Sequence, residues 1–246
     1  GNCKETGNTL DNCKGEAYYF RAWYYYRMFI SYGELTWVNE VLDPVQEQME
    51  KARDSRTLIA DSILADLDKA IMYLNEESNN SNMRVHKDVA RALKSEVALF
   101  EGTWEKYHKA KGDEFYDKSI TDEKIRNYFQ QAADAAKAVI DRGVWSIVNG
   151  DPLTVDRELF ITLDLSANKE ALWRKKYDAS DNIGHSVTRY LNKGGGLTGV
   201  SASLVDDYLT CDGRPFVGAE QENATKVYGN DLDPLLSDPR LSQTVC

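Results

Sequence analysis

The chain has 246 residues, of which 42% are hydrophobic and 28% charged, so it can bury a sizeable core. Lys and Arg total 30 against 40 Asp and Glu, and the resulting net charge of −10 disfavours nucleic acid as a partner, because it repels phosphate. No stretch approaches the roughly 18 to 20 consecutive apolar residues that a membrane-spanning helix needs.

The first predicted element is a helix that opens near Gly15 and stops at Gly33. Nine aromatic side chains lie within residues 16–32 and are distributed around the whole helix. A helix that is apolar on every face is expected to be buried on every face. We therefore predict that this helix is sandwiched between neighbours.

The next predicted helix covers residues 54–74 and is amphipathic. Its apolar side chains recur at spacings of three and four, and its charged side chains occupy the other side. This pattern indicates a surface helix with one buried face. The apolar positions are Ile59, Ile63, Leu67, Ala70, Ile71 and Leu74.

Two further helices are predicted over residues 87–108 and 123–142, the second followed by Gly143. Small alanines on the second helix allow a neighbour to approach closely, and two consecutive helices favour an antiparallel hairpin. The pair is similar to one tetratricopeptide unit with a longer connection. Residues 1–143 are thus predicted to form a helical scaffold.

After Gly143 the pattern changes to short segments separated by Asn, Asp and Gly. Residues 144–148, 171–177 and 186–191 are rich in β-branched and aromatic residues and are predicted to be short strands or extended segments. A brief helix capped by Ser201 or Ser203 and a turn at Asp212-Gly213 follow. We therefore predict a mainly α fold, in which residues 144–246 form a loop and short-strand region of the same domain.

Motifs for catalysis or for cofactors are weak. The run from Gly194 to Gly199 matches the G-x-G-x-x-G pattern, but no βαβ unit surrounds it, which favours a surface loop. The three histidines, His86, His108 and His185, lack metal-ligand spacing. We therefore expect no catalytic residue, no metal and no cofactor.

The four cysteines are too scattered for a disulfide scaffold, and Cys3 and Cys13 remain a possible pair in an oxidising compartment. The chain starts without Met and shows no signal segment, so it is interpreted as a piece of a longer protein.

Aromatic residues in the second half are candidates for ligand binding. A sugar ring offers an apolar C–H face and a rim of hydroxyls, which suits flat aromatic rings beside hydrogen-bonding groups. We single out Trp173, Arg189 and Tyr190 on this chemistry. A packing role for each ring is the alternative interpretation.

Several segments, in order, resemble the SusD/RagB family of nutrient-binding outer-membrane lipoproteins. The aromatic first helix resembles the acidic-Ala-x-x-x-Arg-Ala helix of that family, and residues 32–35 resemble its closing Gly-Asp-x-Pro, although Thr36 stands where proline is usual. Val85-His86 also replaces a commoner Val-Thr. The other similar segments are residues 53–56 with 63–71, 82–87 with 90–104, 132–143, 159–160 with 168–170, 204–208 with 212–213, and 238–241.

The resemblance implies an α/α superhelix that binds oligosaccharide or another nutrient without catalysis. It implies a lipid anchor at the outer face of the outer membrane and a partner TonB-dependent transporter of the SusC type, as in polysaccharide utilisation. Relatives are considerably longer, so the lipid-bearing N-terminus and the C-terminal part are expected to lie outside this chain. Two alternatives remain open: a helical-repeat module that binds protein, and a glycosidase.

Overall fold

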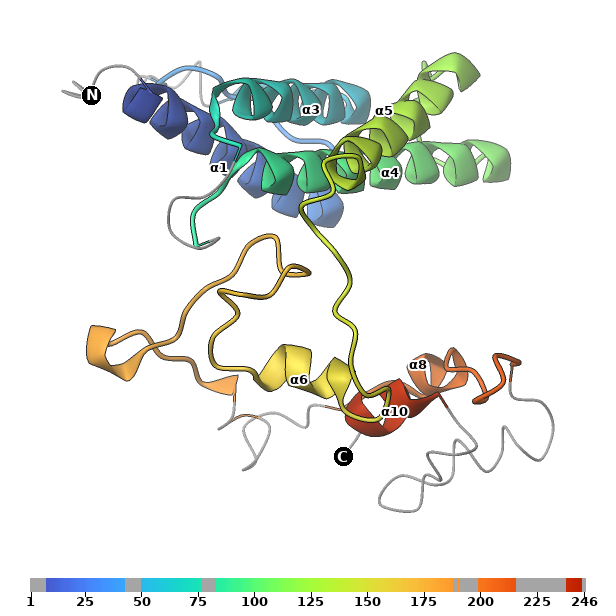
Figure 1. Ribbon diagram of the computed structural model, residues 1–246. Helices are drawn as coiled ribbons and strands as arrows, with labels where there is room; N and C mark the ends of the chain where they lie inside the picture. Colours follow the sequence, from blue (N-terminus) through green and yellow to red (C-terminus); the bar gives the residue numbers. More distant parts are fainter. Residues whose placement is uncertain are drawn as a thin grey trace. The chain divides into compact units, whose positions relative to one another are not determined.

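Helices dominate the computed structural model of the chain, which describes residues 8–42, 50–76, 83–187, 190, 199–215 and 238–244. Four long helices come first: α1 (Asn8–Tyr32), α3 (Arg56–Tyr73), α4 (Lys87–Lys111) and α5 (Asp122–Ile140) (Figure 1). Short helices follow: α6 (Val155–Ile161), the 3-10 helix η1 (Ala179–Asp181), α8 (Ala202–Asp206) and α10 (Pro239–Thr244). The predicted mainly helical fold is confirmed.

The chain divides into two compact units. The first comprises Gly1–Ser146 together with Lys169–Arg174, and the second comprises Ile147–Asn168 together with Lys175–Cys246. The four long helices all belong to the first unit, and α6, η1, α8 and α10 to the second.

Turn and cap residues set the ends of the long helices. Helix α1 begins earlier than predicted and stops where predicted, because Gly33 adopts a φ of 70° and its N–H donates to the carbonyl of Phe29 at 2.9 Å. Ser55 caps α3 by accepting a hydrogen bond from the Leu58 N–H, and Thr121 caps α5 by accepting one from the Lys124 N–H.

The four long helices pack in chain order, α1 on α3, α3 on α4 and α4 on α5 (Figure 1). Helices α4 and α5 form the predicted hairpin. Glycines permit close approach at two of these contacts: a Cβ on Gly15 would lie 2.7 Å from Leu74 Cγ, and one on Gly102 would lie 3.2 Å from Tyr128 Cβ. The core contains residues from all four helices, among them Phe29, Ile63, Leu67, Val97 and Tyr128.

The prediction that α1 is buried on all sides is wrong for the described part of the chain. Tyr19, Ala22, Tyr26 and Phe29 are buried in the core, whereas other rings of the same helix are exposed, Tyr24 by 62%. Phe20, Met28 and Ile30 are exposed as well. Helix α1 packs mainly on α3, so among the described helices only part of its surface is covered.

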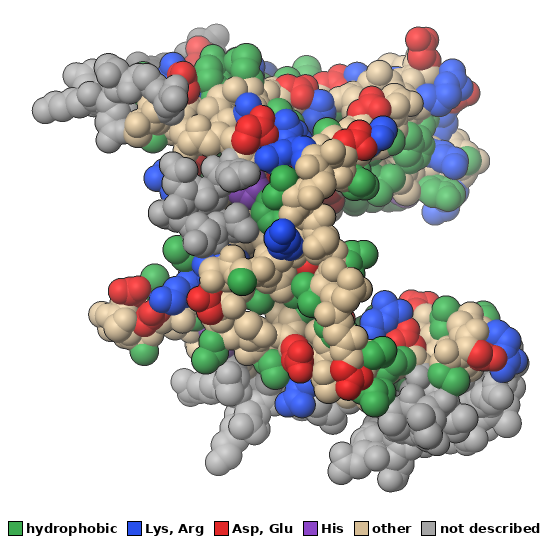
Figure 2. Space-filling view, in the orientation of Figure 1, with side chains coloured by type: hydrophobic (Ala, Val, Ile, Leu, Met, Phe, Trp, Pro, Cys, Tyr) green, Lys and Arg blue, Asp and Glu red, His purple; other side chains and the backbone are tan. Residues whose placement is uncertain are grey.

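Ion pairs tie the helices together, and Figure 2 shows acidic and basic side chains interspersed over them. Between α1 and α3, Arg21 binds Asp66 through two hydrogen bonds of 2.5 and 2.7 Å. At the start of α4, the fully buried Asp88 accepts hydrogen bonds from Arg142 and from the indole N–H of Trp145, which lies 2.7 Å away. Asp88 thereby fastens the segment after α5 to α4.

Residues 169–174, which overlap the predicted strand or extended segment 171–177, contain bends and are held to other residues of the first unit. The Ser146 N–H donates to the Lys169 carbonyl at 3.1 Å, and His86 Nε2 lies 2.9 Å from the Leu172 carbonyl oxygen. Each contact involves one backbone carbonyl of the segment and a different partner residue. The segment therefore has no regular series of hydrogen bonds to a neighbouring strand. The described residues contain no strand, and the bridges among them are isolated.

In the second unit, α10 packs on α6. The amide of Gln243 accepts a hydrogen bond from the Arg157 N–H and donates one to the Pro152 carbonyl, both at 2.9 Å. Ser201 caps α8 as predicted, accepting from the Leu204 N–H at 3.2 Å.

Candidate functional site

Trp173 lies against α1 in the first unit. Its ring meets those of Tyr19 and Phe20 edge to face, with centroids 5.9 and 6.2 Å apart, and its indole N–H donates to the Met83 carbonyl at 3.3 Å. The residue remains 41% exposed. The side chain of Trp173 therefore packs partly on α1, and the rest of it is exposed to solvent.

Tyr190 belongs to the second unit and is 54% exposed. Its N–H donates to the Ser186 carbonyl at 3.1 Å. Arg189, the run 194–198 within the glycine motif, and Cys3 lie outside the described residues. Trp173 and Tyr190 belong to separate units, so each is described within its own unit.

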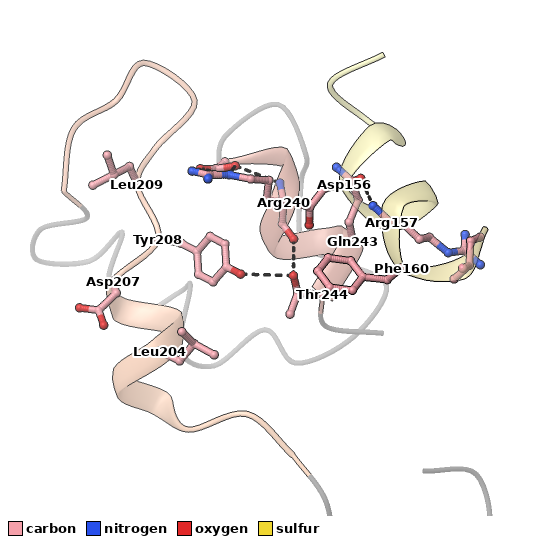
Figure 3. A pocket seen from close by; sticks show the side chains of 12 residues that line it. Asp156, Arg157, Phe160, Leu204, Asp207, Tyr208, Leu209, Arg240, Gln243 and Thr244 are labelled. Carbon is pink, nitrogen blue, oxygen red and sulfur yellow. Dashed lines mark hydrogen bonds and ion pairs between the residues drawn. The ribbon is translucent and has the colours of Figure 1, made fainter. Parts of the chain in front are cut away.

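The second unit contains a pocket of about 770 Å³. This volume falls in the range of roughly 300 to 1,000 Å³ typical of small-molecule sites. Helix α6, the stretch from α8 to Leu209, and α10 with the residue before it each contribute side chains (Figure 3). The residues are Asp156, Arg157, Phe160, Ile161, Leu204, Asp207, Tyr208, Leu209, Asp238, Arg240, Gln243 and Thr244.

Apolar and hydrogen-bonding groups both line this pocket. Phe160 is 80% exposed, so a large part of its ring is free of protein contacts. The hydroxyl of Tyr208 points toward Thr244 and donates to its Oγ1 at 3.2 Å (Figure 3). Such a mixture suits a ligand that has both C–H faces and hydroxyl groups.

Arg240 and Asp238 form the charged part of the pocket wall. The guanidinium Nε lies 3.0 Å from Asp238 Oδ1, and this hydrogen bond is the main reason why the pKa of Asp238 is lowered. Asp238 is therefore ionised at neutral pH and is a poor general acid, since a glycosidase acid needs a raised pKa.

Two other carboxyls have raised pKa values, and both are closed to substrate. Burial raises the pKa of Glu101 to about 8 and also raises the pKa of Glu105. Both side chains are completely inaccessible and face the buried Arg56. Raised pKa values often mark catalytic groups, but here they follow from the burial of both carboxyls beside Arg56.

No pattern in the sequence predicted Phe160, Tyr208, Arg240 or Gln243 as ligand residues. The first three fall within segments that carry the family resemblance, and that was the available signal. In the described part of the chain, no three His, Cys, Asp or Glu side chains are grouped as for a metal ion. No helix in that part has the length and apolar character needed to cross a membrane.

Comparisons with known proteins agree with this architecture. Residues 2–99 match the model of a SusD-like family described as "Starch-binding associating with outer membrane". A search of curated proteins found no match.

Several solved structures share the fold. A SusD-like carbohydrate-binding protein from Bacteroides fragilis is 18% identical, with a TM-score of 0.68 over 97% of this chain and 41% of its own. A second SusD-like protein from Bacteroides fragilis is 23% identical, with a TM-score of 0.63 over 87% of this chain and 38% of its own. A laminarin-binding SusD-like protein is 18% identical, with a TM-score of 0.51 over 70% of this chain and 32% of its own.

The chain thus spans about two fifths of the length of the first two structures that it matches. A SusD-like family model thus matches the first helices of the chain, and the chain shares its helical fold with SusD-like structures over most of its length.

Proposed function

We propose that the chain is part of a non-catalytic glycan-binding protein of the cell surface. The pocket of the second unit is the observation that carries this proposal, because exposed Phe160 and partly buried Tyr208 line it together with Arg240 and Gln243. Rings of this kind stack on the C–H face of a sugar, and the polar side chains bind its hydroxyls. The similar structures support a glycan ligand, since one is named for laminarin and another carries a xylogluco-oligosaccharide.

Trp173, Arg189 and Tyr190 remain proposed ligand contacts. Trp173 and Tyr190 are each partly exposed, as a stacking platform must be. Alanine at either position is expected to weaken glycan binding by more than about 1 kcal/mol, the loss typical of a stacking ring.

The proposed activity is ligand capture without bond cleavage. The ion pair with Arg240 holds Asp238 ionised, so Asp238 is a poor candidate for the general acid of a glycosidase. Proposed partners are an oligosaccharide or another nutrient and a TonB-dependent transporter of the SusC type, to which the ligand is delivered. The proposed location is the outer face of the outer membrane, reached through a lipid anchor.

The test is retention of the full chain on native gels that contain laminarin or xyloglucan, followed by titration calorimetry. Phe160→Ala is expected to abolish retention that the unchanged chain shows. Leu163→Ala is the matched control, since Leu163 is 95% exposed in the same unit and does not line the pocket. Equal retention of both variants would remove the pocket from the proposal.

The second candidate function is a protein-binding helical repeat. A groove of about 480 Å³ on α1 and α4, lined by Leu99, Trp104 and Tyr107 among others, favours it. Tyr107 is 64% exposed there. Capture of a soluble peptide without any polysaccharide retention would favour this function, and release of reducing sugar would favour a glycosidase.

A further inference from the structure

A groove and a hollow meet on the first unit. The groove of about 480 Å³ lies on α1 and α4, and the hollow of about 430 Å³ lies where α1 ends. Trp104 lines both, so the two meet at its ring, and we refer to them together as the joined groove. Along α4 its wall runs from Glu96 to His108, which is about 18 Å, or about three helical turns.

The joined groove offers carbon faces more than free hydrogen-bonding groups. The hydroxyl of Tyr26 already donates to Glu96 Oε1 at 3.1 Å, and the indole N–H of Trp104 donates to the Phe115 carbonyl at 2.8 Å. Their rings remain as apolar wall. Because these polar atoms are bonded within the chain, the groove suits apolar side chains better than a ligand rich in hydroxyls.

Two exposed side chains form the outer part of this apolar wall. Leu99 is 51% exposed and Tyr107 is 64% exposed, and both project from α4. They lie eight residues apart, which is about 12 Å along the helix. Two apolar anchors of a partner that are about two turns apart can therefore contact them together.

The charge of the joined groove is acidic. The carboxylates of Glu34 and Glu114 line the hollow, that of Glu96 lines the groove, and none of them has a basic partner among the described residues. Arg56 is the basic residue of the wall, but it is 5% exposed and its Nε already donates to Glu101. The joined groove therefore attracts a cationic group.

This charge argues against several other occupants. An anionic membrane surface is repelled by the same carboxylates, and a second copy of the chain brings a further net charge of −10. In the described part of the chain, no three side chains are grouped as for a metal ion. A partner that is both apolar and basic covers the rings and pairs with the carboxylates at once.

We propose that the joined groove docks a basic amphipathic helix of a partner protein, about three turns long. Its apolar side chains contact Leu99 and Tyr107, and a lysine or arginine beyond them pairs with Glu34 or Glu114. Helix-in-groove recognition uses apolar anchors of this kind, and the charged pair fixes the direction of the helix. The inference goes beyond glycan binding and holds whether or not the pocket around Phe160 binds a glycan.

The experiment selects partners from a phage-displayed library of helical peptides of about 14 residues, with the full chain immobilised. Enriched peptides are expected to combine apolar residues at spacings of three and four with lysine or arginine. The most enriched peptide is then synthesised and titrated against the full chain by calorimetry. Its affinity should fall as sodium chloride is raised, because salt screens the charge pairs.

Two variants test the two kinds of contact. Tyr107→Ala is expected to weaken peptide binding by about fivefold or more, as for the loss of a central aromatic contact. Glu34→Gln combined with Glu114→Gln is expected to weaken binding by about threefold or more and to reduce its salt dependence. Circular dichroism checks that each variant keeps the helical content of the unchanged chain.

Each variant has a matched control that lines neither part of the joined groove. Tyr24→Ala removes a tyrosine of α1 that is 62% exposed, and Glu123→Gln neutralises an exposed glutamate in the first turn of α5. Both controls should bind the peptide as the unchanged chain does. Equal affinity of Tyr107→Ala and Tyr24→Ala would overturn the inference.

Other outcomes also decide the question. No enrichment of any peptide, or enrichment of acidic or uncharged peptides, overturns the inference. Self-association of the unchanged chain that Tyr107→Ala abolishes assigns the groove to a second copy and overturns it as well.

Phe160→Ala separates this site from the proposed glycan pocket. Peptide binding that survives Phe160→Ala and is lost in Tyr107→Ala supports the joined groove, even where polysaccharide retention fails. Peptide binding that is lost in Phe160→Ala and kept in Tyr107→Ala overturns this inference and leaves the proposed function intact.

Discussion

At the scale of single residues, the helical unit depends on charges that water does not reach. Arg56, Glu101 and Glu105 lie together between α3 and α4, and the two glutamate side chains are inaccessible. Desolvation disfavours the ionised carboxyl, and this is the main cause that raises the pKa of Glu101 from its ordinary 4.5 to about 8. Native Glu101 therefore carries a proton at neutral pH, although Arg56 opposes this.

Glu101 makes stability depend on pH. Because its pKa is higher in the folded chain than in the unfolded chain, the native state holds one more proton between pH 4.5 and about 8, and stability falls as pH rises through this window. Glu101→Gln keeps a neutral side chain and removes this contribution. Urea unfolding from pH 5 to 9 should show the variant gaining stability relative to the unchanged chain as pH rises. Parallel curves would contradict this account.

At the scale of elements, the contact of α1 with the end of α3 depends on Gly15, which has no side chain. A Cβ on Gly15 would lie 2.7 Å from Leu74 Cγ and 2.8 Å from the Leu74 backbone nitrogen. The backbone atom cannot rotate away, so the helix itself would have to shift. Helical propensity alone would favour alanine here, and tertiary contact reverses that preference.

Gly15→Ala is therefore expected to lower the free energy of unfolding by about 1 to 3 kcal/mol, the usual cost of overpacking. Gly184→Ala serves as the control, since a Cβ there meets no atom within 4 Å and the φ of Gly184 is not in the left-handed range. Thermal and urea denaturation should destabilise only the first variant. A Gly15→Ala protein as stable as the Gly184→Ala protein would show that α1 and α3 can separate at little cost.

At the scale of the whole molecule, the two units differ in how many of their described side chains are buried. The extended core of buried side chains comes from the four long helices, whereas in the second unit Val205, Thr210 and Leu241 are the buried residues among those described. Local opening costs less free energy where fewer apolar contacts are lost.

Hydrogen exchange should report this difference directly. Backbone amides in the middle of α3 and α4 are expected to exchange much more slowly than those of α6 and α10, although all lie in helices. Mass spectrometry of peptides from the full chain provides the measurement, and the solvated ends of α3 and α4 provide the internal reference. Equal protection of α3 and α6 would contradict a stability concentrated in the long helices.

The sequence by itself determined the four long helices and α8, because periodicity, caps and glycine stops act over a few residues, whereas α6, η1 and α10 were not predicted. The spacing of Ile59, Ile63 and Leu67 marked the buried face of α3, and Gly33 marked the end of α1. The ordered similar segments also pointed to the SusD-like proteins, whose family model matches residues 2–99. Only the tertiary structure decided which aromatic rings of α1 are exposed. It also decided that Trp173 packs against α1.

The candidate pocket was beyond the reach of local patterns. Phe160, Tyr208 and Arg240 come from three separate segments, and no spacing between them in the chain encodes their meeting. The same holds for Gly15 and Leu74, which are far apart in the chain and meet where α1 packs on the end of α3. Hydrogen bonds within a helix connect near neighbours, whereas a site forms where distant segments pack, so its geometry exists only once the chain has folded.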